Sequence, residues 1–503
     1  MAALDTPSGR LRGELLREGD VGITVHRGIP YAQPPVGPLR LRPPVAAAPW
    51  AGERDATRFG PIAPQPASFM AAFGEPQSED CLTLNVWAPE GATRAPVMVW
   101  FHGGGFTGGS ASTPWYDGRR LAARGVVVVT VNYRLGPLGF LHLEPFGGDA
   151  WRGSANLGLA DQSLAVEWVH SHIEAFGGDP EQVTIFGESA GAMSVCAHLA
   201  RPAAGGRFRR AIAQSGSARH ARDPEVAEAV AAQVLEALGV DHHPERLADL
   251  PVEAFVDVQG RIGPVLGGES TDLPLHFAPT VDGSDLPVRP VDALRGGSAA
   301  GVDLLIGTTS DEMNLFLVLA HRGGGGAVGE DRLRRRLGTA LRRLGRDVTV
   351  DEVEARYRRR LGEADPMAVW SAIATDLVFR VPAIETADAQ RTHADVRMYL
   401  YTHPSTGFDG ALGAAHAMEI PFTFDNTDAQ GVDLLEGPIT PERRELGHRL
   451  ADSWVSFAAT GDPSTAGVGD WPLYGDDRAT MVLDLEHRVE LDPWAGERSV
   501  WYP

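Results

Sequence analysis

The sequence predicts an α/β protein with a mostly parallel central sheet and helices on both faces. Two strongly apolar runs, 97–101 and 126–131, are typical of strands buried on both sides, as in a parallel sheet. A helix is expected over 161–176, with Leu164, Trp168 and Ile173 among the residues that point toward the core. Such alternation of strand and helix favours a doubly wound sheet. Later elements continue the pattern, with strands expected near 183–186, 209–213, 304–306 and 396–401 and a helix over 441–460.

The chain of 503 residues is long enough for several domains, but α/β enzymes with insertions often form one unit of this size. We therefore expect a single catalytic domain over 1–503. Loop-rich and helical stretches interrupt the alternation at about 220–300 and 313–395. These two stretches are predicted to be insertions that cap the site.

Charge and composition exclude some classes of partner. The formal net charge is −21, which argues against nucleic acid or an anionic membrane surface as the main partner. Residues 1–10 have no apolar targeting core, and no run of 18 apolar residues occurs, so we expect a cytoplasmic protein without a membrane span. The two cysteines, Cys81 and Cys196, are too few for a disulfide framework.

Ser189 is the first candidate for a catalytic residue. It stands in the pentapeptide Gly-Glu-Ser-Ala-Gly at 187–191, directly after an apolar strand and before a helix-like stretch over 190–200. A serine at so sharp a strand-to-helix turn needs small neighbours two residues away on each side, which Gly187 and Gly191 supply. This nucleophile-elbow pattern holds the hydroxyl clear of the sheet, with a helix N-terminus behind it that favours negative charge.

A glycine-rich loop is the second element of the predicted site. The sequence His-Gly-Gly-Gly at 102–105 directly follows the apolar strand at 97–101. Glycines let backbone N–H groups approach a ligand at close range, because no Cβ stands in the way. We expect the amides of Gly104 and Gly105, with that of Ala190 after the nucleophile, to form an oxyanion hole.

An activated serine also needs a base and an acid that orients the base. An elbow of this type has its partners in the chain order serine, acid, histidine. His403 and His416 both follow the late strand and compete for the role of base. Asp311 and Glu312 both follow the strand near 304–306, and their spacing does not separate them as the acid.

Six motifs together resemble the type-B carboxylesterases, the carboxylesterase/cholinesterase family, and are most similar to its bacterial para-nitrobenzyl-esterase-type members. They lie at 28–32, 78–86, 102–106, 132–136, 175–191 and 214–216. The resemblance covers nearly the whole chain and implies an α/β-hydrolase fold with the site at the foot of a gorge. The family's acid is the glutamate of an Asp-Glu pair, which selects Glu312. Its histidine stands in the context H-x-x-E-I-x-F, which selects His416.

These observations predict a serine carboxylic-ester hydrolase that acts on small-molecule esters through Ser189, Glu312 and His416 and an acyl-enzyme intermediate. Glu188 and Ser215 are expected to support the site, and the chemistry needs no metal or cofactor. A rival is an acyltransferase or cyclase with the same triad, in which an alcohol or amine intercepts the acyl-enzyme. A non-catalytic binding protein of the same fold is a more distant alternative.

Two departures from the family pattern stand out. Cys81 occupies the second position of an early disulfide that many members have, but no cysteine precedes it here. No tryptophan occurs between Trp50 and Trp87, where cholinesterases place the ring that stacks on choline. A quaternary-ammonium substrate is therefore not expected.

Overall fold

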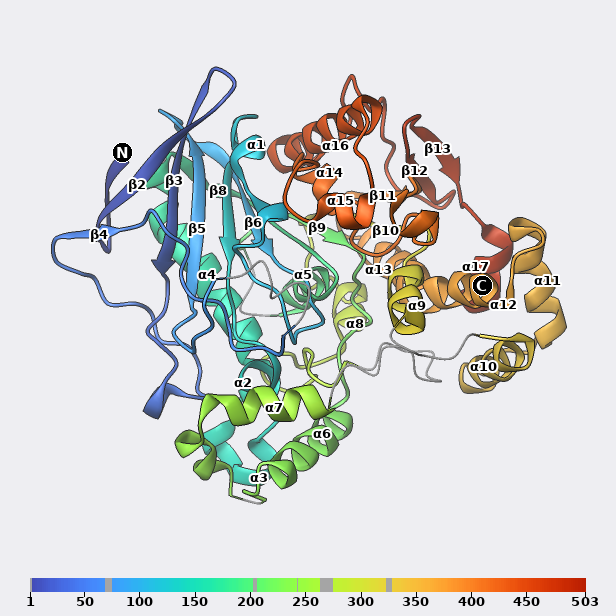
Figure 1. The fold of residues 1–503 in the computed structure, drawn as a ribbon, viewed down its shortest axis with the longest axis horizontal. Coiled ribbons are helices and arrows are strands. Elements are labelled where there is room, and N and C mark those ends of the chain that lie inside the picture. Colours follow the sequence, from blue (N-terminus) through green and yellow to red (C-terminus); the bar gives the residue numbers. More distant parts are fainter. Residues whose placement is uncertain (1, 68–74, 202–205, 242, 263–274, 323–327) are drawn as a thin grey trace.

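The computed structural model describes residues 2–67, 75–201, 206–241, 243–262, 275–322 and 328–503. Within these ranges, thirteen strands form one large sheet in the order β1-β2-β3-β5-β7-β6-β8-β9-β10-β11-β12-β13, with β4 beside β2 (Figure 1). The strands are β1 (Ala2–Thr6), β2 (Gly9–Glu18), β3 (Val21–Pro30), β4 (Glu53–Asp55), β5 (Thr83–Pro89), β6 (Ala95–Phe101), β7 (Val127–Val131), β8 (Gly178–Glu188), β9 (Arg210–Gln214), β10 (Asp303–Thr309), β11 (Val396–Tyr401), β12 (Ala479–Leu483) and β13 (Arg488–Leu491).

The middle of the sheet is parallel, as the apolar runs predict. β7, β6, β8, β9, β10, β11 and β12 each pair in parallel with their neighbours in this order. The flanks of the sheet are antiparallel, from β1 to the β5–β7 pair on one side and at the β12–β13 hairpin on the other. The α/β class with a mostly parallel central sheet is therefore confirmed.

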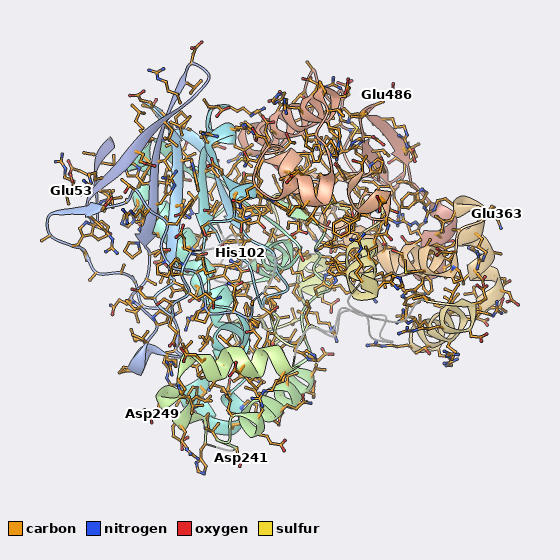
Figure 2. The ribbon with its side chains drawn as sticks, viewed as in Figure 1. Glu53, His102, Asp241, Asp249, Glu363 and Glu486 are labelled. Atoms are coloured by element: carbon orange, nitrogen blue, oxygen red, sulfur yellow. The ribbon has the colours of Figure 1, made fainter. Side chains whose placement is uncertain are left out.

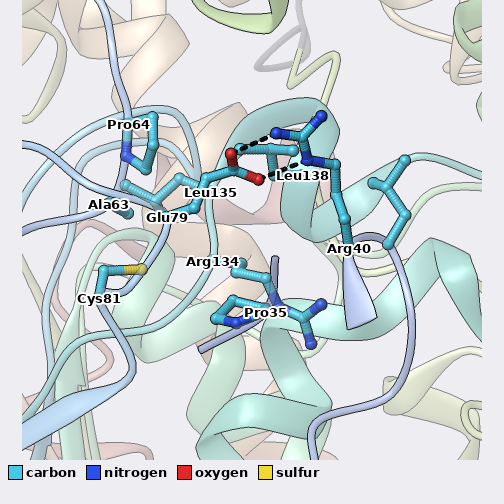
Figure 3. A pocket seen from close by; sticks show the side chains of 10 residues that line it. Pro35, Arg40, Ala63, Pro64, Glu79, Cys81, Arg134, Leu135 and Leu138 are labelled. Atoms are coloured by element: carbon cyan, nitrogen blue, oxygen red, sulfur yellow. Dashed lines mark hydrogen bonds and ion pairs between the residues drawn. The ribbon is translucent and has the colours of Figure 1, made fainter. Parts of the chain in front are cut away.

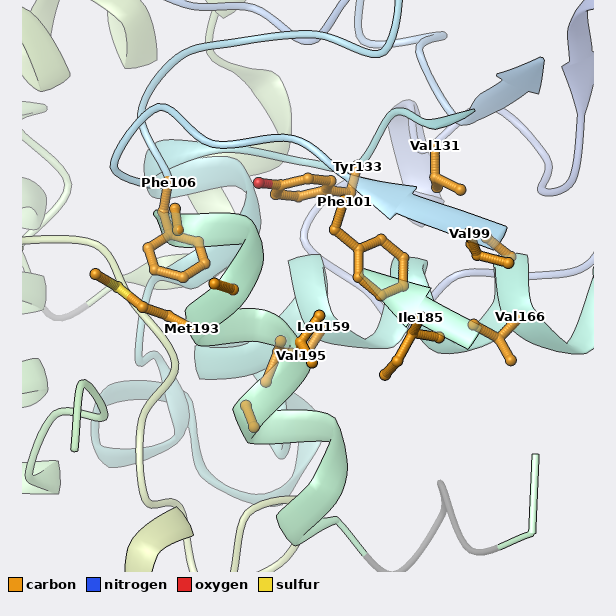
Figure 4. Packing of buried hydrophobic residues seen from close by; sticks show 14 of the residues in the cluster. Val99, Phe101, Phe106, Val131, Tyr133, Leu159, Val166, Ile185, Met193 and Val195 are labelled. Carbon is orange, nitrogen blue, oxygen red and sulfur yellow. The ribbon is translucent and has the colours of Figure 1, made fainter. Parts of the chain in front are cut away.

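Two hydrophobic cores lie on the two faces of this sheet. In β6, Val97, Val99 and Phe101 belong to one core, whereas Met98 and Trp100 belong to the other. The alternation follows from the period of two along a strand, and both sets are buried because both faces are covered. Figure 4 shows the first core, in which Phe101 and Ile185 of the sheet pack with side chains of α4 and α5.

Helices cover both faces of the sheet. The first face carries α4 and α5, and the second carries α14 and α16 (Figure 1). The helices of the first half are α1 (Arg119–Ala122), α2 (Gly136–Phe140), α3 (Glu144–Gly147), α4 (Leu157–His172), α5 (Ala190–Ala200), α6 (Pro224–Ala237), α7 (Val252–Ile262) and α8 (Pro290–Arg295). Those of the second half are α9 (Met313–Arg322), α10 (Glu330–Arg343), α11 (Val350–Leu361), α12 (Pro366–Thr375), α13 (Val381–Gln390), α14 (Ile420–Thr423), α15 (Val432–Glu436), α16 (Pro441–Thr460) and α17 (Ala495–Trp501).

The two predicted insertions extend from the sheet as helical blocks. In Figure 1, α6 and α7 lie below the sheet, and α10 to α12 lie to its right beside the C-terminal α17. The second block has a hydrophobic core of its own, which includes Leu337, Tyr357, Trp370 and Trp501 of α17. Residues 242, 263–274 and 323–327 of these stretches lie outside the described ranges.

One apolar helical stretch, Pro366–Gln390, has the length and composition of a membrane span within the described part of the chain. It consists of α12, a π-helical turn at Asp376–Arg380 and α13. In the structure 83% of its apolar window is buried inside the protein, as in a core helix. The labelled acidic residues in Figure 2, Glu53, Asp241, Asp249, Glu363 and Glu486, lie at the periphery, whereas His102 lies near the centre.

Candidate active site

Ser189 occupies the sharp turn between β8 and α5. Its backbone has φ +55° and ψ −122°, a strained conformation for a residue with a Cβ. The turn is held from both sides, because Ser189 N donates to Gln214 O at 2.8 Å and Met193 N donates to Ser189 O at 2.9 Å. A Cβ at Gly191 would lie 1.9 Å from Phe101 O, so a larger residue does not fit beside the neighbouring strand.

The glycine loop after β6 lies against this turn. A Cβ on Gly103 would come within 3.2 Å of Ser189 Cβ and 2.6 Å of Glu188 Oε2, so the loop touches the serine without a side chain between them. Gly104 and Gly105 both have positive φ, at +111° and +62°. Across the described residues, the amides of Gly104, Gly105 and Ala190 donate to no protein acceptor. These three N–H groups are therefore available to a ligand.

His416 and Glu312 form a short, buried pair. His416 Nδ1 lies 2.6 Å from Glu312 Oε2, and the two side chains come from the loops after β11 and β10. Glu312 is fully buried and also accepts bonds from Ser215 Oγ at 2.6 Å and Thr309 N at 2.8 Å. Both donors bind Oε1, so the carboxylate presents Oε2 to the imidazole and favours the tautomer that carries its proton on Nδ1.

The alternatives left open by spacing have other partners in the structure. The Asp311 carboxylate accepts bonds from Ser310 Oγ at 2.8 Å and from Ala414 N at 3.1 Å. His403 Nδ1 lies 2.9 Å from Asp484 Oδ1, toward the β12 side of the sheet. The structure therefore brings Glu312 and His416 together, whereas Asp311 and His403 form hydrogen bonds with other residues.

Glu188, which was expected only to support the site, lies directly beside the imidazole of His416. His416 Nε2 is 3.1 Å from Glu188 Oε1, and both side chains are buried. Within the described chain, the Ser189 hydroxyl makes no hydrogen bond to His416. The ring nitrogen that would accept the serine proton thus faces the carboxylate of the preceding residue.

A third carboxylate, Glu419, completes the cluster. Glu419 is fully buried and accepts a bond from Gln214 Nε2 at 3.4 Å. Gln214 in turn accepts a bond from Trp454 Nε1 at 3.0 Å. Glu419 is the glutamate of the H-x-x-E-I-x-F context of His416, which was the available signal, but spacing alone does not predict that its side chain returns to the site.

The carboxylates set the charge of His416. Burial by itself disfavours the imidazolium, but Glu188 and Glu312 outweigh burial and raise the pKa of His416 to about 9. Burial also raises the pKa of Glu188 to about 8, with the cation of His416 opposing that change. For Glu419, burial and then the charge of Glu312 raise the pKa to about 7. Burial thus favours the neutral forms of Glu188 and Glu419, and the cation of His416 opposes this for both.

Two phenylalanine rings flank the imidazole. The ring centroids of Phe379 and Phe316 lie 4.8 Å and 5.1 Å from that of His416. Phe379 stands in the π-helical turn Asp376–Arg380, a form that often occurs at functional sites. A buried ion pair between Asp376 and Arg380 spans the same turn, with Arg380 Nε 2.6 Å from Asp376 Oδ1. Periodicity did not reveal either ring as a neighbour of the histidine.

The described residues contain no group of three or more His, Cys, Asp or Glu side chains arranged to hold a metal ion. The site is thus built from one hydroxyl, one imidazole, three carboxylates and backbone amides. This set can activate a serine and stabilise an oxyanion, the two requirements of acyl transfer.

Comparison with known proteins leads to the same chemistry. The model of the carboxylesterase family matches residues 1–498. The chain is 40% identical to a para-nitrobenzyl esterase of Bacillus subtilis, over 99% of this chain and 98% of that protein. It is 35% identical to a phenmedipham hydrolase of Pseudarthrobacter oxydans, over 96% and 94% of the two chains.

Solved structures agree with the sequence comparisons. A carboxylesterase of Geobacillus stearothermophilus superimposes with a TM-score of 0.87 at 40% identity and covers 99% of both chains. A para-nitrobenzyl esterase superimposes with a TM-score of 0.85 at 38% identity, again over 99% of both chains. With the fold, the family match and these relatives in agreement, this chain belongs to the carboxylesterase family and is a serine ester hydrolase with the α/β-hydrolase fold.

Proposed function

We propose that Ser189 is the nucleophile, His416 the general base and Glu312 the residue that orients the base. The 2.6 Å contact between His416 Nδ1 and Glu312 supports this assignment, because the other ring nitrogen lies 3.1 Å from Glu188, the residue before the strained serine. Ser189 Oγ attacks the ester carbonyl while His416 Nε2 accepts its proton. Glu312 then stabilises the imidazolium.

The remaining steps use the same groups. The amides of Gly104, Gly105 and Ala190 bind the oxyanion of the tetrahedral intermediate, each contributing about 3–4 kcal/mol. His416 gives its proton to the departing alkoxide, which leaves an acyl group on Ser189. Water then loses a proton to His416 and attacks the acyl-enzyme. The tetrahedral intermediate collapses, His416 returns the proton to Ser189 Oγ, and the carboxylic acid leaves.

The first proton transfer requires a change at Glu188. The proposed base must turn its Nε2 from Glu188 Oε1 to the hydroxyl of Ser189. A protonated Glu188 no longer holds an imidazolium by charge, and burial favours that neutral form. Hydrogen bonds of catalytic groups often tighten only when substrate is bound. We therefore assign Glu188 to control of the charge of His416, and Ser215 to support of Glu312.

The proposed substrates are small-molecule carboxylic esters with an apolar group near the histidine. The rings of Phe316 and Phe379 support this, because they present aromatic carbon beside His416. The relatives' names fit small substrates: one is a para-nitrobenzyl esterase and one a fumonisin B1 esterase from Sphingopyxis macrogoltabida, 37% identical over 93% of this chain. We further propose that 1–503 is one catalytic domain whose blocks at about 220–300 and 313–395 shape the substrate pocket.

The test is release of p-nitrophenol from short- and medium-chain p-nitrophenyl esters by the wild type and by Ser189→Ala. Intact mass after a fluorophosphonate probe gives the second readout. Turnover and a single adduct on Ser189, both lost in the variant, are expected. Absence of an adduct would refute the assignment of Ser189. Free acid as the product when an alcohol acceptor is added supports hydrolysis, whereas a new ester would indicate an acyltransferase.

A further inference from the structure

The glycine loop at 103–109 is closed on itself. Thr107 N and Gly108 N both donate to Gly104 O, at 3.1 Å and 3.0 Å. The loop is so tight that a Cβ on Gly104 would lie 2.2 Å from Gly108 O. These bonds fix the shape of the loop, but they do not fix its position relative to Ser189. Contacts from outside the loop must do that.

Gln65 holds the far end of the loop through both ends of its amide. Gln65 Nε2 donates to Gly109 O at 3.0 Å, and Gly109 N donates to Gln65 Oε1 at 2.8 Å. The same Nε2 donates to Ala63 O at 3.0 Å, and the side chain is buried. A side-chain amide offers a donor and an acceptor side by side, so the residue type fits this double contact. Gly109 lies directly against Gly103, since a Cβ at Gly109 would be 2.4 Å from Gly103 O. Holding Gly109 therefore also limits the movement of Gly103.

Gln259 holds the loop from another part of the chain. It lies on α7, is buried, and its Nε2 donates to Thr107 O at 2.6 Å. Gly136 leaves the space for this side chain, because a Cβ there would lie 1.8 Å from Gln259 Oε1. Gly136 N also donates to Phe106 O at 2.7 Å. The helical block at about 220–300 therefore reaches the loop directly through one hydrogen bond.

A small pocket lies beside the segment that precedes Gln65. Ala63 and Pro64 line it on one side, and Leu135 and, on α2, Leu138 line it on another. Figure 3 shows the Arg40–Glu79 ion pair bordering this pocket, with Cys81 and Arg134 also in its lining. The hydrogen bonds of the Gln65 side chain join this segment to the glycine loop.

We propose that Gln65 and Gln259 are positioning residues, which hold the amides of Gly104 and Gly105 where the oxyanion forms. This inference rests on the oxyanion role proposed above for these amides. Catalysis then also depends on the position of α7, because a shift of that helix would break the hydrogen bond from Gln259 to Thr107 O. Neither glutamine has a place in the proposed proton transfers.

The experiment compares Gln65→Leu and Gln259→Leu with the wild type. Leucine is similar in size but has no hydrogen-bonding group. Three quantities are measured: kcat and KM for p-nitrophenyl butyrate, the inhibition constant of an alkyl trifluoromethyl ketone, and the thermal midpoint. The ketone adds to the nucleophile and places an oxyanion in the hole, so its affinity reports the hole itself.

We expect kcat to fall about 10- to 100-fold in each variant while KM changes less than about 3-fold, since the loop is displaced and no donor is removed. The affinity of the ketone should fall by the same factor as kcat. Gln65→Glu keeps the acceptor for Gly109 N but loses the donor, so its kcat should lie between those of Gln65→Leu and the wild type. Gln259→Glu, which keeps the shape but loses the N–H donor, serves if the leucine variant does not fold.

Gln390→Leu is the matched control. Gln390 is also a buried glutamine that donates to two carbonyls, Ala299 O at 2.8 Å and Val302 O at 2.9 Å, but it lies on α13 away from the loop. It should lower the thermal midpoint without changing kcat. The inference is overturned if the Gln65 and Gln259 variants keep kcat and ketone affinity within about 2-fold, or if Gln390→Leu loses as much kcat. A wild type that shows neither turnover nor an adduct on Ser189 would instead refute the proposed function.

Discussion

Replacement of Glu188 by glutamine should move the acidic limb of the pH–rate profile to lower pH. The carboxylate lies 3.1 Å from His416 Nε2 and favours the imidazolium, which cannot accept the proton of Ser189. Glutamine has nearly the same shape but carries no charge. Its introduction therefore lowers the pKa of His416, so more of the enzyme holds a neutral base at any pH below that pKa.

The size of the effect follows from the geometry. Burial opposes the imidazolium, yet the pKa of His416 reaches about 9 against an ordinary 6.5, which corresponds to about 3 kcal/mol of net stabilisation of the charged form. Two charges at 3.1 Å interact by about 5 kcal/mol at an effective dielectric constant of about 20, so Glu188 could supply this alone. Because Glu312 shares the effect, we expect the limb to move by about one to two pH units.

The assay is kcat/KM for a p-nitrophenyl ester from about pH 5 to about pH 10, where the acidic limb reports the base of the free enzyme. Glu419→Gln is the matched control, because Glu419 is equally buried but bonds Gln214 and not His416. It should move the limb in the same direction by a smaller amount. An unmoved limb in Glu188→Gln, or a shift to higher pH, would refute the view that this carboxylate sets the charge of the histidine.

Three further predictions concern the frame of the site. Gly103→Ala should lower kcat at least about 100-fold with an intact fold by circular dichroism, because its Cβ would meet Glu188 and Ser189; Gly329→Ala, which has open space, should have no effect. Ser215→Ala should lower kcat by about 10-fold, since Glu312 loses one of its donors, and an unchanged kcat would show that the remaining donors suffice. Asp376→Ala should cost about 3–5 kcal/mol in urea unfolding because it leaves Arg380 buried without its partner, whereas Asp149→Ala at the exposed pair with Arg152 should cost less than about 1 kcal/mol.

Strands, helices and turns that depend on a short segment of sequence could be predicted from that segment alone. The apolar runs at 97–101 and 126–131 became β6 and β7, and the helix expected over 441–460 is α16. Ser189 could be placed on its turn because a strand, small neighbours and a helix lie within one short segment. The loop amides of Gly104 and Gly105 could be expected for the same reason, since glycine favours the positive φ that both residues adopt.

Contacts between segments that are distant in the sequence could not be predicted from local sequence. Spacing left Asp311 and Glu312 equal, because only the fold shows which carboxylate turns toward His416. Periodicity likewise gave no reason to bring Glu419 back to the site, or to place Gln259 of α7 against Thr107. These contacts depend on side-chain packing across the sheet, and residues so far apart in sequence leave no local pattern.

The order of strands also affects how this protein can change over evolutionary time. β9, β10 and β11 are neighbours in the sheet, yet long stretches of chain separate β9 from β10 and β10 from β11. Both excursions leave and re-enter at sheet positions that parallel pairing already fixes. Insertions, deletions and recombination within them, away from Gln259 and Glu312, can therefore change the chain between the strands while the register of the strands is kept. Directed libraries confined to these two excursions should yield a larger share of folded variants than libraries of equal size spread over the strands.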